Sequence, residues 1–277
     1  MSPAEPGSPS VQRALGQAQR RAVTELVRVS PVADALGRRF VAAGHEIALV
    51  GGSVRDALLG RLGDDLDFAT SARPEEAEEL VADLAQAVWD IGRDFGTIGC
   101  RIGGVTCEIT TYRSDAYQPT SRKPQVAYGD TLDGDLGRRD FTVNAMAVRL
   151  PGTTFVDPYG GLVDLAENRL RTPGRPEDSF GDDPLRMMRA ARFASQLGFG
   201  VADDVLAAMT AMSDRLTIVS AERVRDELVK LVMSGDPRTG LGLMCDTGLA
   251  DHVLPELPAL RLEVDEHHHH KDVYEHT

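Results

Sequence analysis

The spacing of hydrophobic residues changes along the chain. Up to about residue 170, short apolar runs bounded by turn residues predict strands, including residues 47–50, 66–70 and 153–156. Beyond Pro176 the apolar residues recur at helical spacing, with no strand expected among them. The expected helices of this second part are residues 184–197, 201–212, 221–233 and 239–249. The pattern predicts the α+β class, with a small mixed sheet in a first domain and an all-helical domain after it.

Residues 97–110 alternate between apolar and polar around Gly103 and Gly104. Two glycines at the centre of such a pattern predict a hairpin with a two-residue turn. The register would place Cys100 opposite Cys107, and we interpret both as small core residues. The chain has three cysteines and no CxxC pair, so neither a disulfide framework nor a zinc ribbon is expected.

The run at residues 47–50 leads directly into Gly51 and Gly52, and then into a short helix that Gly60 ends. Glycines before a helix N-terminus leave backbone N–H groups open to a triphosphate. The alternative is an ordinary turn between a strand and a helix. The phosphate-binding interpretation is favoured because Arg55 and a pair of aspartates follow within the same strand–turn–helix–strand unit.

Those aspartates are Asp65 and Asp67, two residues apart on an expected strand, so their side chains point to the same face. Carboxylates this close repel each other unless a cation intervenes. Oxygen ligands of this kind suit Mg²⁺, which takes one or two carboxylates together with substrate phosphates. An acidic loop end without function is the alternative for the pair taken alone.

Composition narrows the class of protein. The 277 residues are 42% hydrophobic and carry a formal charge of −13, which argues against nonspecific coating of nucleic acid. Only three of the 30 basic residues are lysines, so nearly every cation is a guanidinium suited to phosphate or base edges. No membrane helix or signal peptide is evident, and we expect a cytoplasmic protein that does not bind membranes.

Several blocks together resemble a known family. They are LVGGSVRDALLG with DDLDFAT, RRDFTVNAMA at residues 138–147, DPYGG at 157–161, and DDPLRMMRAARF at 182–193. From about residue 46 onward the chain is similar to the class II nucleotidyltransferases, which comprise tRNA CCA-adding enzymes and bacterial poly(A) polymerases. The resemblance implies a nucleotidyltransferase head domain followed by a helical neck.

The resemblance also implies roles for individual residues. Asp65 and Asp67 would be the catalytic, Mg²⁺-binding pair, and Glu108 is a weaker candidate for a third carboxylate. Triphosphate and sugar would contact Gly52, Arg55 and Arg139. The Watson–Crick edge of the incoming base would be read by Asp183 and Arg186. Arg189 and Arg192, on the same helix stripe, are also expected to bind the nucleotide. A solvated charged face is the alternative for that stripe.

The resemblance also implies domain boundaries. We expect a tail and helix at 1–30, the head at 31–172, the RNA- and nucleobase-binding neck at 173–250, and the start of a truncated HD-type helical domain at 251–277. In that last segment His267 to His270 precede His276, which would match a first metal ligand. Arg113 and the polar loop 114–130 match a region that, in the family, helps the site switch from adding C to adding A.

The expected function is template-independent addition of C, C and A to the 3′ end of tRNA by two-metal-ion nucleotidyl transfer, with CTP and ATP as substrates and pyrophosphate as product. Neck arginines, including Arg215, Arg223 and Arg225, are candidates for contacts to the tRNA backbone. Two alternatives remain open: a poly(A) polymerase that uses ATP alone, and a non-catalytic RNA- or nucleotide-binding module of the same fold. No protein partner is predicted.

Overall fold

The computed structural model describes residues 16, 31–92, 96–116, 125–129, 131–152 and 154–260. The histidines at 267–270 and His276 lie outside these residues, as does most of the expected tail. The chain divides into two compact units, Met1–Glu167 and Asn168–Thr277. This division falls five residues before the boundary expected at 172, because Arg169–Leu170 pairs with a strand of the second unit.

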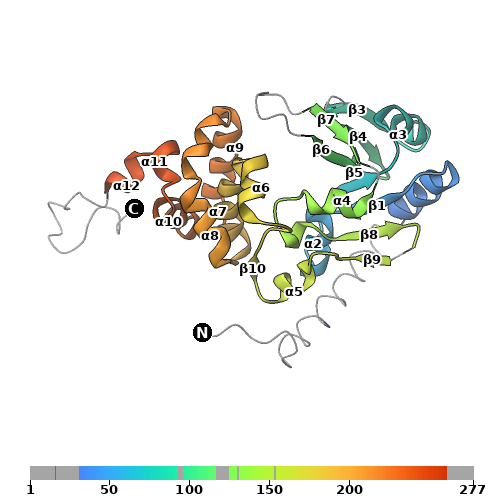
Figure 1. Cartoon of the computed structure of the whole chain (residues 1–277). Helices are drawn as coiled ribbons and strands as arrows, with labels where there is room; N and C mark the ends of the chain where they lie inside the picture. The colour runs from blue at the N-terminus through green and yellow to red at the C-terminus, as the bar shows by residue number, and fades with distance from the viewer. Residues whose placement is uncertain are drawn as a thin grey trace. The chain divides into compact units, whose positions relative to one another are not determined.

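Seven strands in the described part of the first unit form one mixed sheet, in the order β3-β4-β5-β2-β1-β8-β9 (Figure 1). Their bounds are Ile47–Val50 (β1), Asp65–Thr70 (β2), Ala87–Gly92 (β3), Thr97–Ile102 (β4), Val105–Thr111 (β5), Ala147–Leu150 (β8) and Thr154–Val156 (β9). Strands β2 and β5 pair in parallel, and the other neighbours are antiparallel. The predicted α+β class is therefore confirmed.

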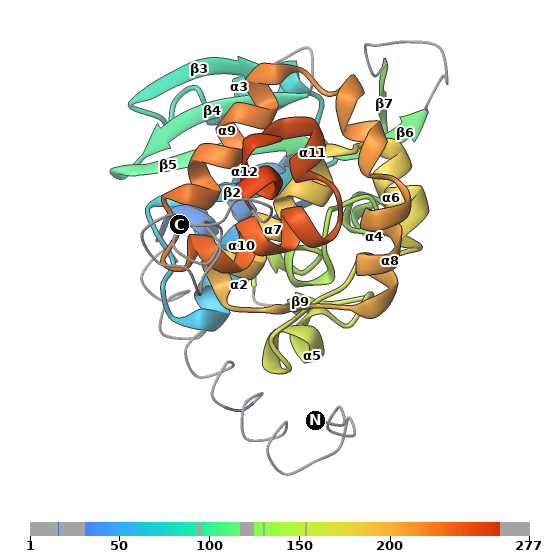
Figure 2. The ribbon, with the colours of Figure 1, turned by 90° about the vertical axis from the view of Figure 1, so that its left-hand side faces the viewer.

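The hairpin of β4 and β5 forms as its alternating pattern predicts, and the two strands lie side by side in Figure 2. Gly103 and Gly104 have φ values of 59° and 86°. A two-residue turn that matches strand twist requires positive φ at both positions, which glycine adopts without steric cost. Cys100 and Cys107 are register partners and are buried as free thiols, so the register of the hairpin is confirmed.

Short helices lie before, between and after the strands of the first unit: residues 31–42, α2 (Gly52–Leu59), α3 (Pro74–Val81), α4 (Leu132–Gly137) and α5 (Gly161–Ala166). A 3₁₀ turn, η2, covers Thr142–Asn144. Helix α2 ends as predicted at Gly60, whose φ of 72° is left-handed. Within the core, Ala48, Val50 and Ala69 pack with the buried residues Leu132 and Leu136 of α4.

The segment expected to be a loop at 114–130 proved to contain strands at both ends. Strand β6 (Arg113–Ala116) pairs antiparallel with β7 (Gln125–Tyr128) in a separate two-stranded sheet. Its polar composition gave no apolar alternation to indicate strands, whereas backbone pairing does not depend on side-chain hydropathy. Residues 117–124 lie outside the described part.

Over its described residues, 168–260, the second unit is helical apart from one short strand pair. Its elements are β10 (Arg169–Leu170), α6 (Pro176–Asp182), α7 (Leu185–Leu197), β11 (Gly200–Val201), α8 (Asp203–Ala211), η3 (Ser213–Ile218), α9 (Ala221–Val232), α10 (Pro237–Asp246), α11 (Ala250–Val253) and α12 (Glu256–Ala259). The expectation of no strand beyond residue 176 was wrong, because β11 pairs in parallel with β10. Two residues are too short for a hydropathy period to register.

Helix α7 is the centre of this unit, with α9 and α10 packed along it. Its buried face includes Met187 and Met188, neither of them accessible to solvent. Helix α10 approaches closely at Gly240, where an added Cβ would lie 2.7 Å from the carbonyl oxygen of Ala191. The Gly240 N–H instead donates to the Ser195 hydroxyl at 2.7 Å. Glycine is therefore required for this contact between helices.

Within the described residues, every helix is too short or too polar to cross a bilayer. The expected cytoplasmic location stays a prediction.

Candidate active site

Asp65 and Asp67 lie on strand β2, where a spacing of two residues places both side chains on one face of the sheet. Asp65 is exposed and Asp67 is partly buried. Burial raises the pKa of Asp67, and the carboxylates of Asp65 and Asp56 raise it further. The guanidinium groups of Arg139 and Arg55 oppose this shift. The structure thus gathers two other carboxylates and two arginines around Asp67.

The turn at Gly51 and Gly52 lies directly against these arginines. Gly51 has a φ of 66°, and a Cβ added there would lie 2.6 Å from Nη1 of Arg139. A Cβ at Gly52 would lie 3.5 Å from Nη2 of Arg55 and 3.8 Å from Oδ2 of Asp67. The structure therefore brings together Gly52, Arg55, Asp67 and Arg139, all of which the sequence predicted to share a site.

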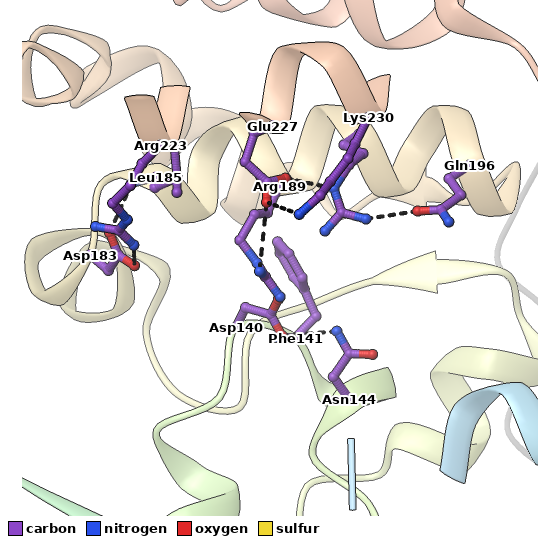
Figure 3. Close-up of polar contacts among 11 residues, drawn as sticks. Asp140, Phe141, Asn144, Asp183, Leu185, Arg189, Gln196, Arg223, Glu227 and Lys230 are labelled. Atoms are coloured by element: carbon purple, nitrogen blue, oxygen red, sulfur yellow. Dashed lines mark hydrogen bonds and ion pairs between the residues drawn. The ribbon is translucent and has the colours of Figure 1, made fainter. Parts of the chain in front are cut away.

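A buried hydrogen-bond network orients Arg55. Its Nη1 donates to Oδ1 of Asn144 at 2.6 Å, while Nε and Nη2 donate to the two oxygens of Asp56 at 3.0 and 2.9 Å. Asn144 in turn donates from Nδ2 to Oδ1 of Asp140 at 2.9 Å (Figure 3). Asn144 belonged to a quoted sequence block, but nothing in the block's spacing indicated this role.

A second acidic residue, Asp135 of α4, holds Arg139. Nη2 of Arg139 donates to Oδ2 of Asp135 at 3.0 Å, and the carboxyl group is buried. Sequence reasoning missed Asp135. The available signal was its i,i+4 spacing to Arg139, which is equally common on solvated helix faces.

Glu108 lies beside the aspartate pair, because it is the register partner of Asp67 across the parallel strands β2 and β5. Burial raises the pKa of Glu108, and Asp67 and Asp65 raise it further. Even so, no group of three or more His, Cys, Asp or Glu side chains in the part of the chain that the structure describes could hold a metal ion. The candidate donor set is therefore Asp65 and Asp67, which suits a cation that also binds water and phosphate.

In the second unit, the predicted base reader Asp183 lies between α6 and α7, and Arg186 lies in the first turn of α7. Oδ1 of Asp183 accepts from the Leu185 N–H at 3.2 Å, and Oδ2 accepts from Nη2 of Arg223 at 2.7 Å (Figure 3). Arg186 donates from Nη1 to the hydroxyl of Ser179 at 2.8 Å. Both side chains are thus held by partners within their own unit.

The remaining two arginines of the stripe meet Glu227 of α9. Arg192 is buried, and its Nε donates to Oε2 of Glu227 at 2.6 Å, while Nη1 donates to Oε1 of Gln196 at 2.7 Å. Its guanidinium also stacks over the ring of Phe193, 4.0 Å from the centroid. Arg189 lies farther away, with Nη1 3.8 Å from Oε1 of Glu227. Binding of nucleotide by these two arginines stays a prediction.

Comparison with known proteins defines the class. The profile of the family described as "Poly A polymerase head domain" matches residues 47–171. A second profile, described as "Probable RNA and SrmB-binding site of polymerase A", matches residues 198–260. The chain belongs to the class II tRNA nucleotidyltransferase and poly(A) polymerase family.

Two curated relatives of this chain are CCA-adding enzymes. The CCA-adding enzyme of Levilactobacillus brevis is 43% identical over 208 residues, which are 75% of this chain and 51% of the relative. The CCA-adding enzyme of Geobacillus kaustophilus is 40% identical over 232 residues, 83% of this chain and 56% of the relative. The chain therefore spans about half the length of the curated relatives it matches.

Solved structures of CCA-adding enzymes are also similar to this chain. The Bacillus stearothermophilus CCA-adding enzyme in complex with CTP is 34% identical, with a TM-score of 0.70, over 87% of this chain and 53% of that one. The Thermotoga maritima CCA-adding enzyme complexed with tRNA is 27% identical, with a TM-score of 0.71, over 86% and 56% of the two chains. The predicted architecture of a nucleotidyltransferase head followed by a helical neck is confirmed.

Proposed function

We propose that this protein adds C, C and A to the 3′ end of tRNA without a nucleic-acid template, using CTP and ATP and releasing pyrophosphate. The observation that carries the proposal is the placement of Asp65 and Asp67 on one face of the sheet. The positive charges of Arg55 and Arg139 interact with Asp67, and the Gly51–Gly52 turn lies beside these three side chains. CCA-adding relatives and their CTP and tRNA complexes support the choice of substrates.

The aspartates fit a divalent cation. Two carboxylates on adjacent outward positions of one strand repel each other, and a bound cation relieves that repulsion. Asp65 and Asp67 would hold Mg²⁺, which supplies charge stabilisation at the α-phosphate and at the attacking 3′ oxygen. The tRNA 3′ hydroxyl attacks the α-phosphorus in line, and the bond to the β-phosphate oxygen breaks, so pyrophosphate leaves.

The neighbouring groups bind the triphosphate. Arg55 and Arg139 supply fixed positive charge, and the glycine turn allows its backbone N–H groups to approach phosphate oxygens. Because their partners already orient both guanidinium groups, little reorganisation is needed when the nucleotide binds.

Selection of the base is assigned to the second unit. Asp183 would accept a hydrogen bond from the exocyclic amine of cytosine or adenine, and Arg186 would donate to the adjacent ring nitrogen or carbonyl. Uracil and guanine would leave these groups unpaired, and such sites discriminate by about 10⁴-fold. Arg192 would contribute by fixing α7 against α9, since its guanidinium binds Glu227, and Arg189 would face the nucleotide or the tRNA.

A primer-extension assay tests the proposal. The protein is incubated with Mg²⁺ and a tRNA that lacks its 3′ CCA, with CTP, ATP or both, and the product length is read on a sequencing gel. Three added residues only when both nucleotides are present would support CCA addition, and two added residues would indicate CC addition. Asp65→Asn and Asp67→Asn should abolish extension, and extension by both variants would refute the metal-site assignment.

Poly(A) polymerase is the second candidate, because the head-domain profile carries that description. It would produce a long ladder from ATP alone in the same assay. A non-catalytic binding module would retain nucleotide or tRNA affinity and release no pyrophosphate.

A further inference from the structure

The buried acidic side chain of α4, Asp135, contacts Arg139 but has no role in the proposed function. Asp135 is 4% exposed, and its two oxygens have different partners. Oδ2 accepts from Nη2 of Arg139 at 3.0 Å, and Oδ1 accepts, more weakly, from the backbone N–H of Arg113 at 3.4 Å. Burying a carboxylate costs free energy unless it is paired, and the contacts of Asp135 with Arg139 and Arg113 offset that cost.

Arg139 depends on this contact for its orientation. Its Nε is buried without a hydrogen-bond partner among the described residues, and Nη1 lies against the Gly51 turn. Among the described contacts, Nη2 with Asp135 is the ion pair that fixes the guanidinium plane. Without it, the flexible arginine stem could rotate the charge away from Asp67 and from the Gly51–Gly52 turn.

We propose that Asp135 is a positioning residue for nucleotide binding: it holds Arg139 so that Nη1 faces the Gly51–Gly52 turn beside Asp67. The inference rests on the proposed function, in which Arg139 contacts the triphosphate. Fixing the Arg139 guanidinium before the nucleotide binds removes the entropy cost of ordering that side chain during binding. A displacement of about 1 Å in such a group can reduce activity by about 10²-fold.

Asp133 provides a matched control, since it lies two residues away on the same helix and its side chain is exposed. Asp135→Asn and Asp133→Asn remove the same charge without changing side-chain size. We expect Asp135→Asn to lower kcat/KM for CTP by about tenfold to a hundredfold, mainly through a higher KM. Asp133→Asn should stay within about twofold of the wild type.

A double-mutant cycle separates positioning from a general structural role. If Asp135 acts through Arg139, adding Asp135→Asn to the Arg139→Met variant should lower kcat/KM for CTP by less than a further factor of about two. Full additivity of the two losses would overturn the proposal, as would an Asp135→Asn protein with wild-type kinetics. Asp135→Glu keeps the buried charge and should fall between wild type and Asp135→Asn, which provides a test if the asparagine variant does not fold.

The affinity for CTP with Mg²⁺, measured by calorimetry, gives a second readout of the same cycle. Wild-type protein that binds CTP but extends no tRNA would refute the proposed function and leave the positioning role testable through affinity. Wild-type extension together with equal CTP affinities for Asp135→Asn and Asp133→Asn would refute the positioning role alone.

Discussion

Replacing Glu227 by glutamine should destabilise the helical unit, because the change leaves a buried arginine without its counter-charge. Glu227 and Arg192 are 4% and 7% exposed, and the Nε of Arg192 lies 2.6 Å from Oε2 of Glu227. The pair joins α9 to α7, the helix at the centre of the unit. Glutamine has nearly the same size as glutamate, so the variant tests charge rather than packing.

The magnitude follows from what Arg192 retains. Breaking a buried ion pair by removing one partner typically costs about 3–5 kcal/mol. Arg192 keeps its hydrogen bond to Gln196 and its contact with Phe193, and the new amide still offers an oxygen acceptor. We therefore expect the lower end, about 3 kcal/mol, which is about a hundredfold in the ratio of folded to unfolded protein.

Urea denaturation followed by circular dichroism measures this loss. With an m-value of about 2 kcal/mol per molar urea, the midpoint of the helical unit should fall by about 1.5 M. Asp226→Asn is the matched control, since it removes the partner of the exposed Arg225 on the same helix and should leave the midpoint unchanged. Equal midpoints for Glu227→Gln and Asp226→Asn would refute the reasoning.

Three further predictions concern the sites themselves. Because the pKa of Asp67 is raised, its ionised form is disfavoured in the folded protein; with divalent ions chelated, Asp67→Asn should increase the unfolding free energy at pH 7, and the gain should shrink as the pH falls toward the ordinary aspartate value of about 4. Arg223→Met removes the ion pair to Asp183 and should reduce discrimination against UTP by about tenfold in extension assays, while Arg225→Met should not. Asn144→Ala removes a buried partner of Arg55 and should cost about 1–3 kcal/mol in urea denaturation; an unchanged midpoint would contradict the network.

Local patterns in the sequence determined much of the first unit. Strand β1, the glycine turn and α2 formed where the apolar run, Gly51–Gly52 and Gly60 predicted them. The hairpin around Gly103 and Gly104 formed in the predicted register. These features depend on neighbours within a few residues, so backbone conformation and side-chain period are sufficient to indicate them. The same holds for the four long helices of the second unit.

Only the tertiary structure decided which distant residues meet. The parallel pairing of β2 with β5 placed Glu108 beside Asp67, and the sequence carries no local signal for a pairing across 41 positions. The fold buries Arg192 in an ion pair with Glu227, whereas Arg189 on the same helix stripe is more exposed. Asp135 likewise looked identical to Asp133 until the fold enclosed one and exposed the other. Charge pattern and spacing are properties of the local chain, whereas the partner and burial of a charged side chain depend on long-range packing.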